Sequence, residues 1–277
     1  MRIFCGVMLF WIAVQTGYGQ RVYADATQIS VTPPVLVTLA SVENQGRAID
    51  LPDTLNFSTL NVSVGALGII YARQNLQFIN NPKPSRFSPI ITKIGRQGSL
   101  IDLLGRFKVQ RTNGNINNLV EPDYSGSQLL NLLNLFGGGE VGTLVFLPNG
   151  DDFDGIRFEV TSFLSAAVSA HYYYAFYIAS PTLSNHTIHL CEGASGTATI
   201  SNFQPGYTYR LYTAQAGGTQ VWNDITTNTI TIPPDSEGSY WLEAREGNVY
   251  PSARVKITVT VHPLPGKPQV TLTDELN

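Results

Sequence analysis

The chain has 277 residues, of which 13% are charged, and its formal net charge at pH 7 is −3. Because phosphate recognition needs concentrated positive charge and the sequence has no cluster of Lys and Arg, we expect no nucleic-acid partner. Tyr, Phe, Gly and Pro are abundant, a composition typical of exported β-proteins with many turns and not of helical cytosolic enzymes.

The first 19 residues have the pattern of a secretion signal. Arg2 is the only early positive charge, residues 3–14 are almost continuously apolar, and Gly17 and Gly19 place small residues where a signal peptidase inspects the chain. The apolar run is shorter than the roughly 20 residues that a membrane-spanning helix needs. We expect cleavage after Gly19, a mature chain that begins at Gln20 and has no transmembrane segment, and a secreted or cell-surface product.

Residues 20–180 predict an antiparallel β-sandwich of jelly-roll type. Short apolar stretches separated by Gly, Pro and Asn predict strands at residues 28–31, 35–41, 60–64, 66–73, 76–79, 90–94, 105–109, 141–147, 155–160 and 171–178. Leucines at near-helical spacing over residues 127–136, followed by three glycines at 137–139, predict a short helix that covers one end of the sandwich.

Two groups of aspartates in predicted turns are candidate ligands for a hard cation such as Ca²⁺, which prefers carboxylate oxygens. Asp151, Asp152 and Asp154 lie in one turn, and Asp50 and Asp53 lie in an earlier one. Asn, Asp and Gly are also the ordinary residues of hairpin turns, so a plain solvated turn is the alternative. No other cofactor is expected.

The strongest aromatic run is residues 171–177. In a strand, alternate side chains face opposite sides, so Tyr172, Tyr174 and Phe176 are expected on one face and Tyr173 and Tyr177 on the other. One face should join the core. Tyr173 and Tyr177 are candidate ligand-binding residues, since a tyrosine ring offers a sugar a flat apolar body with a polar edge. A closing strand packed on both faces is the alternative.

Residues 181–268 read as a complete immunoglobulin-like β-sandwich, with short alternating strands closed by turn residues at regular spacing. The last residues, 269–277, resemble the first strand of a further module or form a tail. Cys5 leaves with the signal, so Cys191 is alone in the mature chain. We expect a buried, small apolar side chain there, and an intermolecular disulfide is the alternative.

The motifs in this second segment resemble the bacterial Ig-like repeats of large cell-surface proteins of Bacteroidetes, the gliding-bacteria group. The resemblance rests on the entry Cys-x-Gly at 191–193, the hairpin at 209–219, the strand Gly-x-Tyr-Trp at 238–241 and the exit that begins Ser-Ala-Arg at 252–254. In these repeats the early Cys usually pairs with a second Cys just before the Ser-Ala-Arg run. Here that neighbourhood is Asn-Val-Tyr-Pro at 248–251, so the resemblance implies a missing disulfide, at a loss of about 2–4 kcal/mol that packing around Tyr250 should partly offset.

The first segment resembles galactose-binding-like (discoidin-type) jelly rolls more loosely. The shared order is an early Ala-x-Asp turn at 48–50, an Arg-bearing strand at 154–160 and a late aromatic strand at 172–177. In such folds the early turn often holds a cation, which implies the same role for Asp50 and Asp53. No ligand is carried over from this likeness.

The sequence has none of the local motifs that mark common catalytic sites: no Gly-x-Ser-x-Gly, no His-Glu-x-x-His and no phosphate-binding glycine loop. We therefore predict an exported, non-catalytic cell-surface adhesion or scaffold protein, not an enzyme, that binds cell-surface components or polysaccharide through a β-sandwich with an Ig-like spacer. The alternative is a carbohydrate-binding module protein associated with secreted glycan degradation. A hydrolase with a site between the two domains is a third hypothesis.

Overall fold

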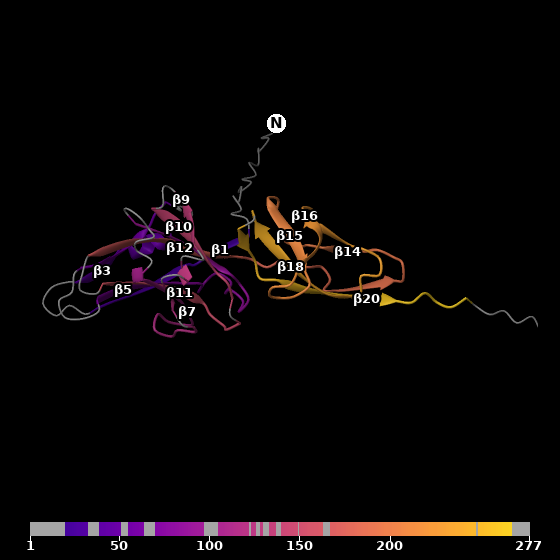
Figure 1. Ribbon diagram of the computed structural model, residues 1–277, viewed down its shortest axis with the longest axis horizontal. Coiled ribbons are helices and arrows are strands. Elements are labelled where there is room, and N and C mark those ends of the chain that lie inside the picture. Colours follow the sequence, from indigo (N-terminus) through magenta and orange to yellow (C-terminus); the bar gives the residue numbers. More distant parts are fainter. Residues whose placement is uncertain are drawn as a thin grey trace, which may run out of the picture.

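The computed structural model describes residues 20–267, apart from 33–38, 51–54, 64–69, 97–104, 122, 126–127, 130–132, 137–139, 149, 163–166 and 248. Two β domains lie end to end along the long axis of the molecule, the first in indigo to magenta and the second in orange to yellow (Figure 1). The predicted all-β fold of two successive sandwiches is confirmed. Within the described residues, no helix is both long and apolar enough to span a bilayer.

The first domain consists of strands β1–β12 in two antiparallel sheets. The sheet that contains β12 has the order β3 (Ala40–Glu43), β4 (Ser58–Val62), β12 (Val168–Ile178), β6 (Ile90–Gly95), β10 (Val141–Phe146) and β9 (Leu133–Phe136), with β1 (Arg21–Tyr23) also paired to β12. The sheet that contains β11 has the order β2 (Ala26–Val31), β5 (Ile70–Gln77), β11 (Gly155–Ser162), β7 (Phe107–Thr112) and β8 (Tyr124–Ser125). A 3₁₀ turn, η1 (Gln45–Ala48), follows β3.

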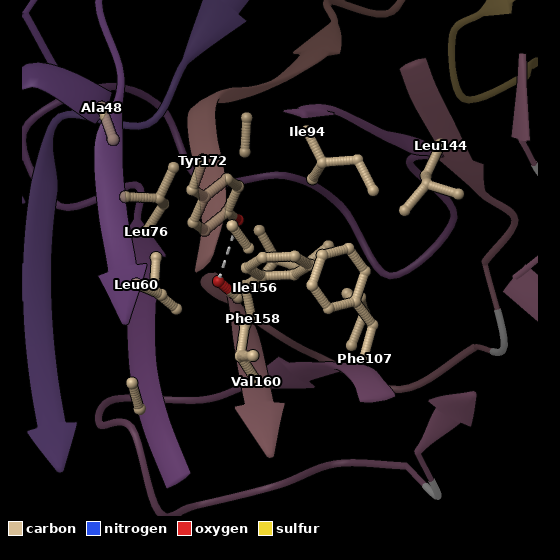
Figure 2. Close-up of a cluster of buried hydrophobic side chains, with 14 of the residues drawn as sticks. Ala48, Leu60, Leu76, Ile94, Phe107, Leu144, Ile156, Phe158, Val160 and Tyr172 are labelled. Atoms are coloured by element: carbon tan, nitrogen blue, oxygen red, sulfur yellow. Dashed lines mark hydrogen bonds between the residues drawn. The ribbon is translucent and has the colours of Figure 1, made fainter. Parts of the chain in front are cut away.

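The core of the first domain lies between these sheets, where every other residue of each strand points inward. The Phe158 ring contacts the rings of Phe107 and Tyr172, with centroids 4.4 Å and 4.9 Å apart (Figure 2). The Tyr172 hydroxyl donates a hydrogen bond to the Ile156 carbonyl at 3.4 Å, so its polar end is satisfied. Fully burying each such aromatic side chain contributes roughly 1.5–3 kcal/mol.

Two predicted strands, 66–73 and 76–79, are one continuous strand in the structure, β5. Gln74 and Asn75 lie between the two predicted strands, and both are fully buried. Gln74 Nε2 donates to Thr27 Oγ1 and to the Gln45 carbonyl, while the Asn75 Oδ1 accepts from Thr112 Oγ1 at 2.9 Å. Neighbouring strands and η1 thus supply partners for the Gln74 amide nitrogen and the Asn75 amide oxygen, so both polar residues can lie inside a strand.

The predicted helix at 127–136 is wrong over most of its described part. Gln128 and Leu129 are helical, but residues 133–136 form β9 and pair with β10 in register, Leu133 opposite Leu144. The ladder offered by β10 outweighs the helical spacing of the leucines, as tertiary context routinely overrides local propensity. The sequence also predicts a helical turn or a tight loop at residues 99–104 and at 163–170. Residues 99–104 and 163–166 lie outside the described residues, and 168–170 are instead part of β12.

The second domain consists of β13–β20. Its main sheet has the order β13 (Thr187–Cys191), β20 (Val255–His262), β18 (Gly238–Glu246), β15 (Tyr207–Tyr212) and β16 (Gln220–Ile225), with β19 (Tyr250–Pro251) on β18. The smaller sheet pairs β14 (Gly196–Thr199) with β17 (Thr229–Ile232). β13 runs parallel to β20, and the other pairs are antiparallel.

Cys191 is exposed, which corrects the expectation that it is buried. Along β13 the exposure alternates, so Ile188 and Leu190 point into the core while Thr187, His189 and Cys191 point outward. The period-2 geometry of the strand, not the apolar character of the thiol, decides its position.

Candidate functional site

The junction between the two domains is a continuous apolar contact. Tyr23 of β1, Ile91 of β6, and Phe176 and Ile178 of β12 all belong to the hydrophobic cluster of the second domain. Ile178 also forms a parallel β-bridge to Ser252. The second domain thus covers the part of the outer face of the β12 sheet that carries these side chains, and the contact is apolar like a domain core.

Arg21 and Glu246 form the polar part of this junction. Arg21 Nε and Nη2 donate to the two carboxylate oxygens of Glu246 at 2.7 Å and 2.8 Å. The guanidinium lies over the Phe176 ring at 4.6 Å, and the edge of the Tyr250 ring meets Phe176 at 5.7 Å. Burial by itself would lower the pKa of Arg21, but the hydrogen bonds to Glu246 and Tyr23 raise it overall. The contact is a bidentate, charge-assisted ion pair.

Gln20, the predicted first residue of the mature chain, is held by the second domain. Its backbone N–H donates to the Tyr207 hydroxyl at 3.1 Å, and its side-chain Nε2 donates to the Tyr209 hydroxyl at 2.9 Å and the Asn202 carbonyl at 2.8 Å. Burial raises the pKa of Tyr207 to about 12, so its hydroxyl stays neutral. The start of the first domain is anchored by residues almost 190 positions away.

Tyr250 lies just before the Ser-Ala-Arg run, in the segment where the similar repeats usually have their second cysteine. Its ring packs on Phe176, and its hydroxyl lies 3.3 Å from Thr143 Oγ1 of the first domain. The packing around Tyr250 that the sequence predicts is present, and it joins the two domains.

Elsewhere on the outer face of the β12 sheet lies a group of side chains that we call the His171 patch: Phe57, Lys93, His171 and Tyr173. The first three are half-buried, and Tyr173 is 9% exposed. The His171 and Phe57 rings are stacked with centroids 4.0 Å apart, and Lys93 Nζ lies 4.4 Å from the centre of the Tyr173 ring. Burial lowers the pKa of both His171 and Lys93, and burial together with the charge of Glu140 raises the pKa of Tyr173. The patch combines aromatic surface with an amine and an imidazole.

The predicted division of the aromatic strand into faces is wrong beyond Tyr172, because β12 contains a bulge. The register with β6 shifts between Tyr172 and Tyr174. Tyr172 and Tyr177 therefore both enter the core, while Tyr174 and Phe176 pack against the second domain. Tyr177 is buried and donates its hydroxyl to the Pro82 carbonyl at 2.8 Å, so it does not share an outer face with Tyr173. Ligand binding by Tyr173 stays a prediction.

The candidate calcium ligands are dispersed among other contacts. Asp154 is buried, and its carboxylate accepts from the Gly114 N–H at 2.8 Å and from Lys83 Nζ at 3.1 Å. Asp152 pairs with Arg86 at 3.1 Å. Asp151 is exposed. Across the described part of the chain, no three His, Cys, Asp or Glu side chains are grouped as a metal ion would require.

Asp50 borders a surface hollow of about 690 Å³ around η1, lined also by Asn44 and Arg47. Asp53 lies outside the described residues. Calcium binding by either group of aspartates stays a prediction.

The sequence did not point to a buried charged network on the outer face of the β11 sheet. Glu159 accepts from Arg73 Nε at 2.5 Å and lies 3.5 Å from Arg157 Nη2. The loop that contains Gly114 and Ile116 covers this face: Arg157 Nη1 donates to the Ile116 carbonyl at 3.1 Å. The signal in the sequence was the polar character of alternate residues along these strands.

The chain itself covers part of this second face. Asn75 Nδ2, Gln77 Oε1 and Arg157 Nε are buried there without a hydrogen-bond partner among the described residues.

Comparison with known proteins identifies the second domain. Residues 179–263 match the family model described as an Ig-like domain, CHU_C associated, so this domain is a bacterial Ig-like domain. No curated protein matches the sequence of the chain.

Several solved structures are similar to the chain at low identity. A β-1,2-glucanase from Parabacteroides distasonis has 11% identity and a TM-score of 0.37, over 90% of this chain and 37% of the glucanase. A low-affinity xylan-binding module from Roseburia intestinalis has 12% identity and a TM-score of 0.32, over 57% of this chain and 92% of the module. The BSP domain of a biofilm-associated protein has 10% identity and a TM-score of 0.22, over 79% of this chain and 54% of that domain.

Proposed function

We propose that this chain is an exported, non-catalytic cell-surface protein of Bacteroidetes type that acts in adhesion or as a scaffold of surface assembly. The first domain, a discoidin-like jelly roll, recognises a cell-surface component or polysaccharide. The Ig-like domain holds the first domain in a fixed orientation.

The junction is the observation that supports this proposal. A recognition domain under mechanical load binds best when its orientation is fixed by the neighbouring domain. Here the two domains share an apolar cluster, and the Arg21–Glu246 ion pair lies beside it. Ordinary inter-domain contacts within a chain are more polar and permit relative motion. The shared cluster makes the Ig-like domain a rigid extension of the sandwich.

The test is made on intact cells. Antibody labelling and protease accessibility should place the chain on the outer surface, and deletion of the gene should reduce attachment or surface assembly. Complementation with Arg21→Ala combined with Phe176→Ala should restore display but not full attachment, because the orientation of the first domain is released. An internal location, or attachment that is unchanged by the deletion, would contradict the proposal.

A second candidate function is carbohydrate binding by the first domain. The His171 patch favours it, since aromatic rings beside hydrogen-bonding groups suit sugar recognition. A glycan array probed with the whole chain should then show binding that Tyr173→Ala and His171→Ala weaken. Binding that both variants leave unchanged would remove this patch from consideration.

A further inference from the structure

The Ig-like domain carries a surface groove of its own, at the open side of the sandwich where strands β16 and β17 border each other. Its volume is about 540 Å³, within the range of small-ligand sites. Its lining includes Trp222, Asn223, Asp224, Thr229 and Thr231. All lining residues belong to the second domain, so the groove is separate from the junction and from the His171 patch. In Figure 1, β16 lies next to β15, and it is the edge strand of the main sheet of the second domain.

Trp222 adopts an unusual backbone conformation at this groove. Its φ is 60°, in the left-handed region that residues with a side chain rarely occupy. The β15–β16 ladder is interrupted here: Leu211 pairs with Val221 and Tyr209 with Ile225, so two extra residues bulge outward. The Trp222 ring lies 4.9 Å from that of Tyr240 and remains partly exposed. Such outliers concentrate at functional sites, where the surrounding structure holds them.

The groove offers neutral hydrogen-bonding groups. Arg210 donates two hydrogen bonds of 2.9 Å to Asp224, and Gln220 Nε2 donates a third at 2.7 Å, so the one carboxylate of the lining is compensated. Thr229 and Thr231 are exposed because β17 alternates, with Ile230 and Ile232 in the core. The rest of the lining consists of threonine hydroxyls, the Asn223 amide, the Trp222 indole and the apolar side chains of Ile225 and Pro233.

We propose that this groove binds a neutral saccharide chain, with the Trp222 indole against a sugar face and Asn223, Thr229 and Thr231 as hydrogen-bonding partners. Neutral polyol ligands match a surface whose charge is internally compensated, whereas an acidic glycan would need a cation not already paired. A peptide added as a further strand is disfavoured, because the bulge at Trp222 interrupts the edge of β16. The Ig-like domain then has a ligand of its own in addition to its contact with the first domain. This binding does not rest on the proposed function.

The experiment uses tryptophan emission of the whole chain. The sequence contains Trp11, Trp222 and Trp241. In a background with Trp11→Phe and Trp241→Phe, Trp222 is the sole indole. Titration with neutral hexasaccharides of xylose, glucose and mannose should give a saturable change in emission for at least one of them. An acidic oligogalacturonate should give none.

Two variants assign the binding to the groove. By isothermal calorimetry on the otherwise unaltered chain, Trp222→Ala should weaken binding by about tenfold or more, as the loss of an aromatic anchor does. Thr231→Val removes the hydroxyl but keeps the shape of the exposed side chain. The thermal midpoint of this variant should equal that of the unaltered chain, while its saccharide binding weakens about threefold to tenfold. The matched control is Thr197→Val, which lies directly opposite Thr231 on β14 but outside the groove lining.

The outcomes separate the proposal from its competitors. No saturable change with any of the three neutral hexasaccharides at about 10 mM would overturn it, because even a site with a Kd of about 1 mM would then be nearly saturated. Preferential binding of the acidic oligomer would overturn the neutral ligand class. Equal loss in Thr231→Val and Thr197→Val would overturn the location. Binding that Tyr173→Ala abolishes and Trp222→Ala leaves intact would place the saccharide on the first domain instead.

Discussion

At the residue scale, Arg21 is the side chain on which the junction depends most. It donates to Glu246 with two nitrogens and lies over Phe176, so one side chain joins β1, β12 and β18. An ion pair of this kind is strong only when both partners remain, because removal of one leaves the other poorly solvated.

Replacement of Arg21 by Ala should lower the free energy of unfolding by about 1–3 kcal/mol, the usual value of hydrogen bonds to charged groups. Chemical denaturation followed by circular dichroism measures it. The control is Arg86→Ala, which removes an ion pair to Asp152 whose side chains are 51% and 70% exposed, and which should cost less than about 1 kcal/mol. Equal losses would show that the junction pair contributes no more than a surface one.

His171 makes a second residue-scale prediction, on pH. Burial lowers its pKa below the ordinary 6.5. The unfolded chain therefore takes up a proton at higher pH than the folded chain does. The contribution of His171 to the free energy of unfolding should thus be complete above pH 6.5, decrease as the pH falls below it, and level off below the folded-state pKa.

His171→Phe keeps a ring against Phe57 but cannot be protonated. Thermal midpoints measured across this pH range should fall less steeply with acid in the variant than in the unaltered chain. Identical slopes would exclude a role for His171.

At the element scale, the bulge in β12 shows what the sequence could and could not predict. The run of aromatic residues predicted a strand correctly, since its bulk and alternation suit a sheet. A single extra residue at Tyr173 then reversed the faces beyond it, and no local pattern announces such an irregularity. Tyr177 was therefore assigned to the wrong face, although it lies in a correctly predicted strand.

Gly95 is the neighbour that accommodates the bulge. A Cβ at this position would lie 3.0 Å from Tyr173 Cε2 and 3.1 Å from the Glu140 carbonyl oxygen. Gly95→Ala should therefore destabilise the fold by about 1–3 kcal/mol through overpacking. Gly46→Ala is the control, because a Cβ there meets nothing within 4 Å and should change stability by no more than about 0.5 kcal/mol. Denaturant midpoints measure both, and a harmless Gly95→Ala would contradict the described packing of Tyr173.

Other elements were predictable to the extent that a single strand carries its own signal. The Ig-like strands follow regular alternation and turn chemistry, and their prediction is confirmed. β9 was missed and β5 was divided into two strands because both depend on partners: β9 on the ladder of β10, and β5 on the groups that hydrogen-bond to Gln74 Nε2 and Asn75 Oδ1. The candidate site was less predictable still, since Phe57, Lys93 and His171 come from three separate segments.

At the scale of the whole molecule, the shared apolar cluster predicts that the domains unfold together. Tyr23, Ile91, Phe176 and Ile178 pack with the core of the Ig-like domain, so separation of the domains would expose them. Differential scanning calorimetry should show one transition with equal calorimetric and van't Hoff enthalpies.

The double variant Arg21→Ala, Phe176→Ala should split this transition into two, because it removes both the polar and the aromatic part of the contact. Two independent transitions in the unaltered chain would show that the junction does not couple the domains.

The anchoring of Gln20 also has a consequence for the order of events during synthesis. A polypeptide leaves the ribosome from its amino end, yet the groups that bind Gln20 and Arg21 are Tyr207, Tyr209 and Glu246. The first strand therefore cannot make these contacts until the chain has been synthesised as far as Glu246. Its docking therefore comes late, and a chain truncated before Glu246 would leave the apolar side of β12 without part of its cover.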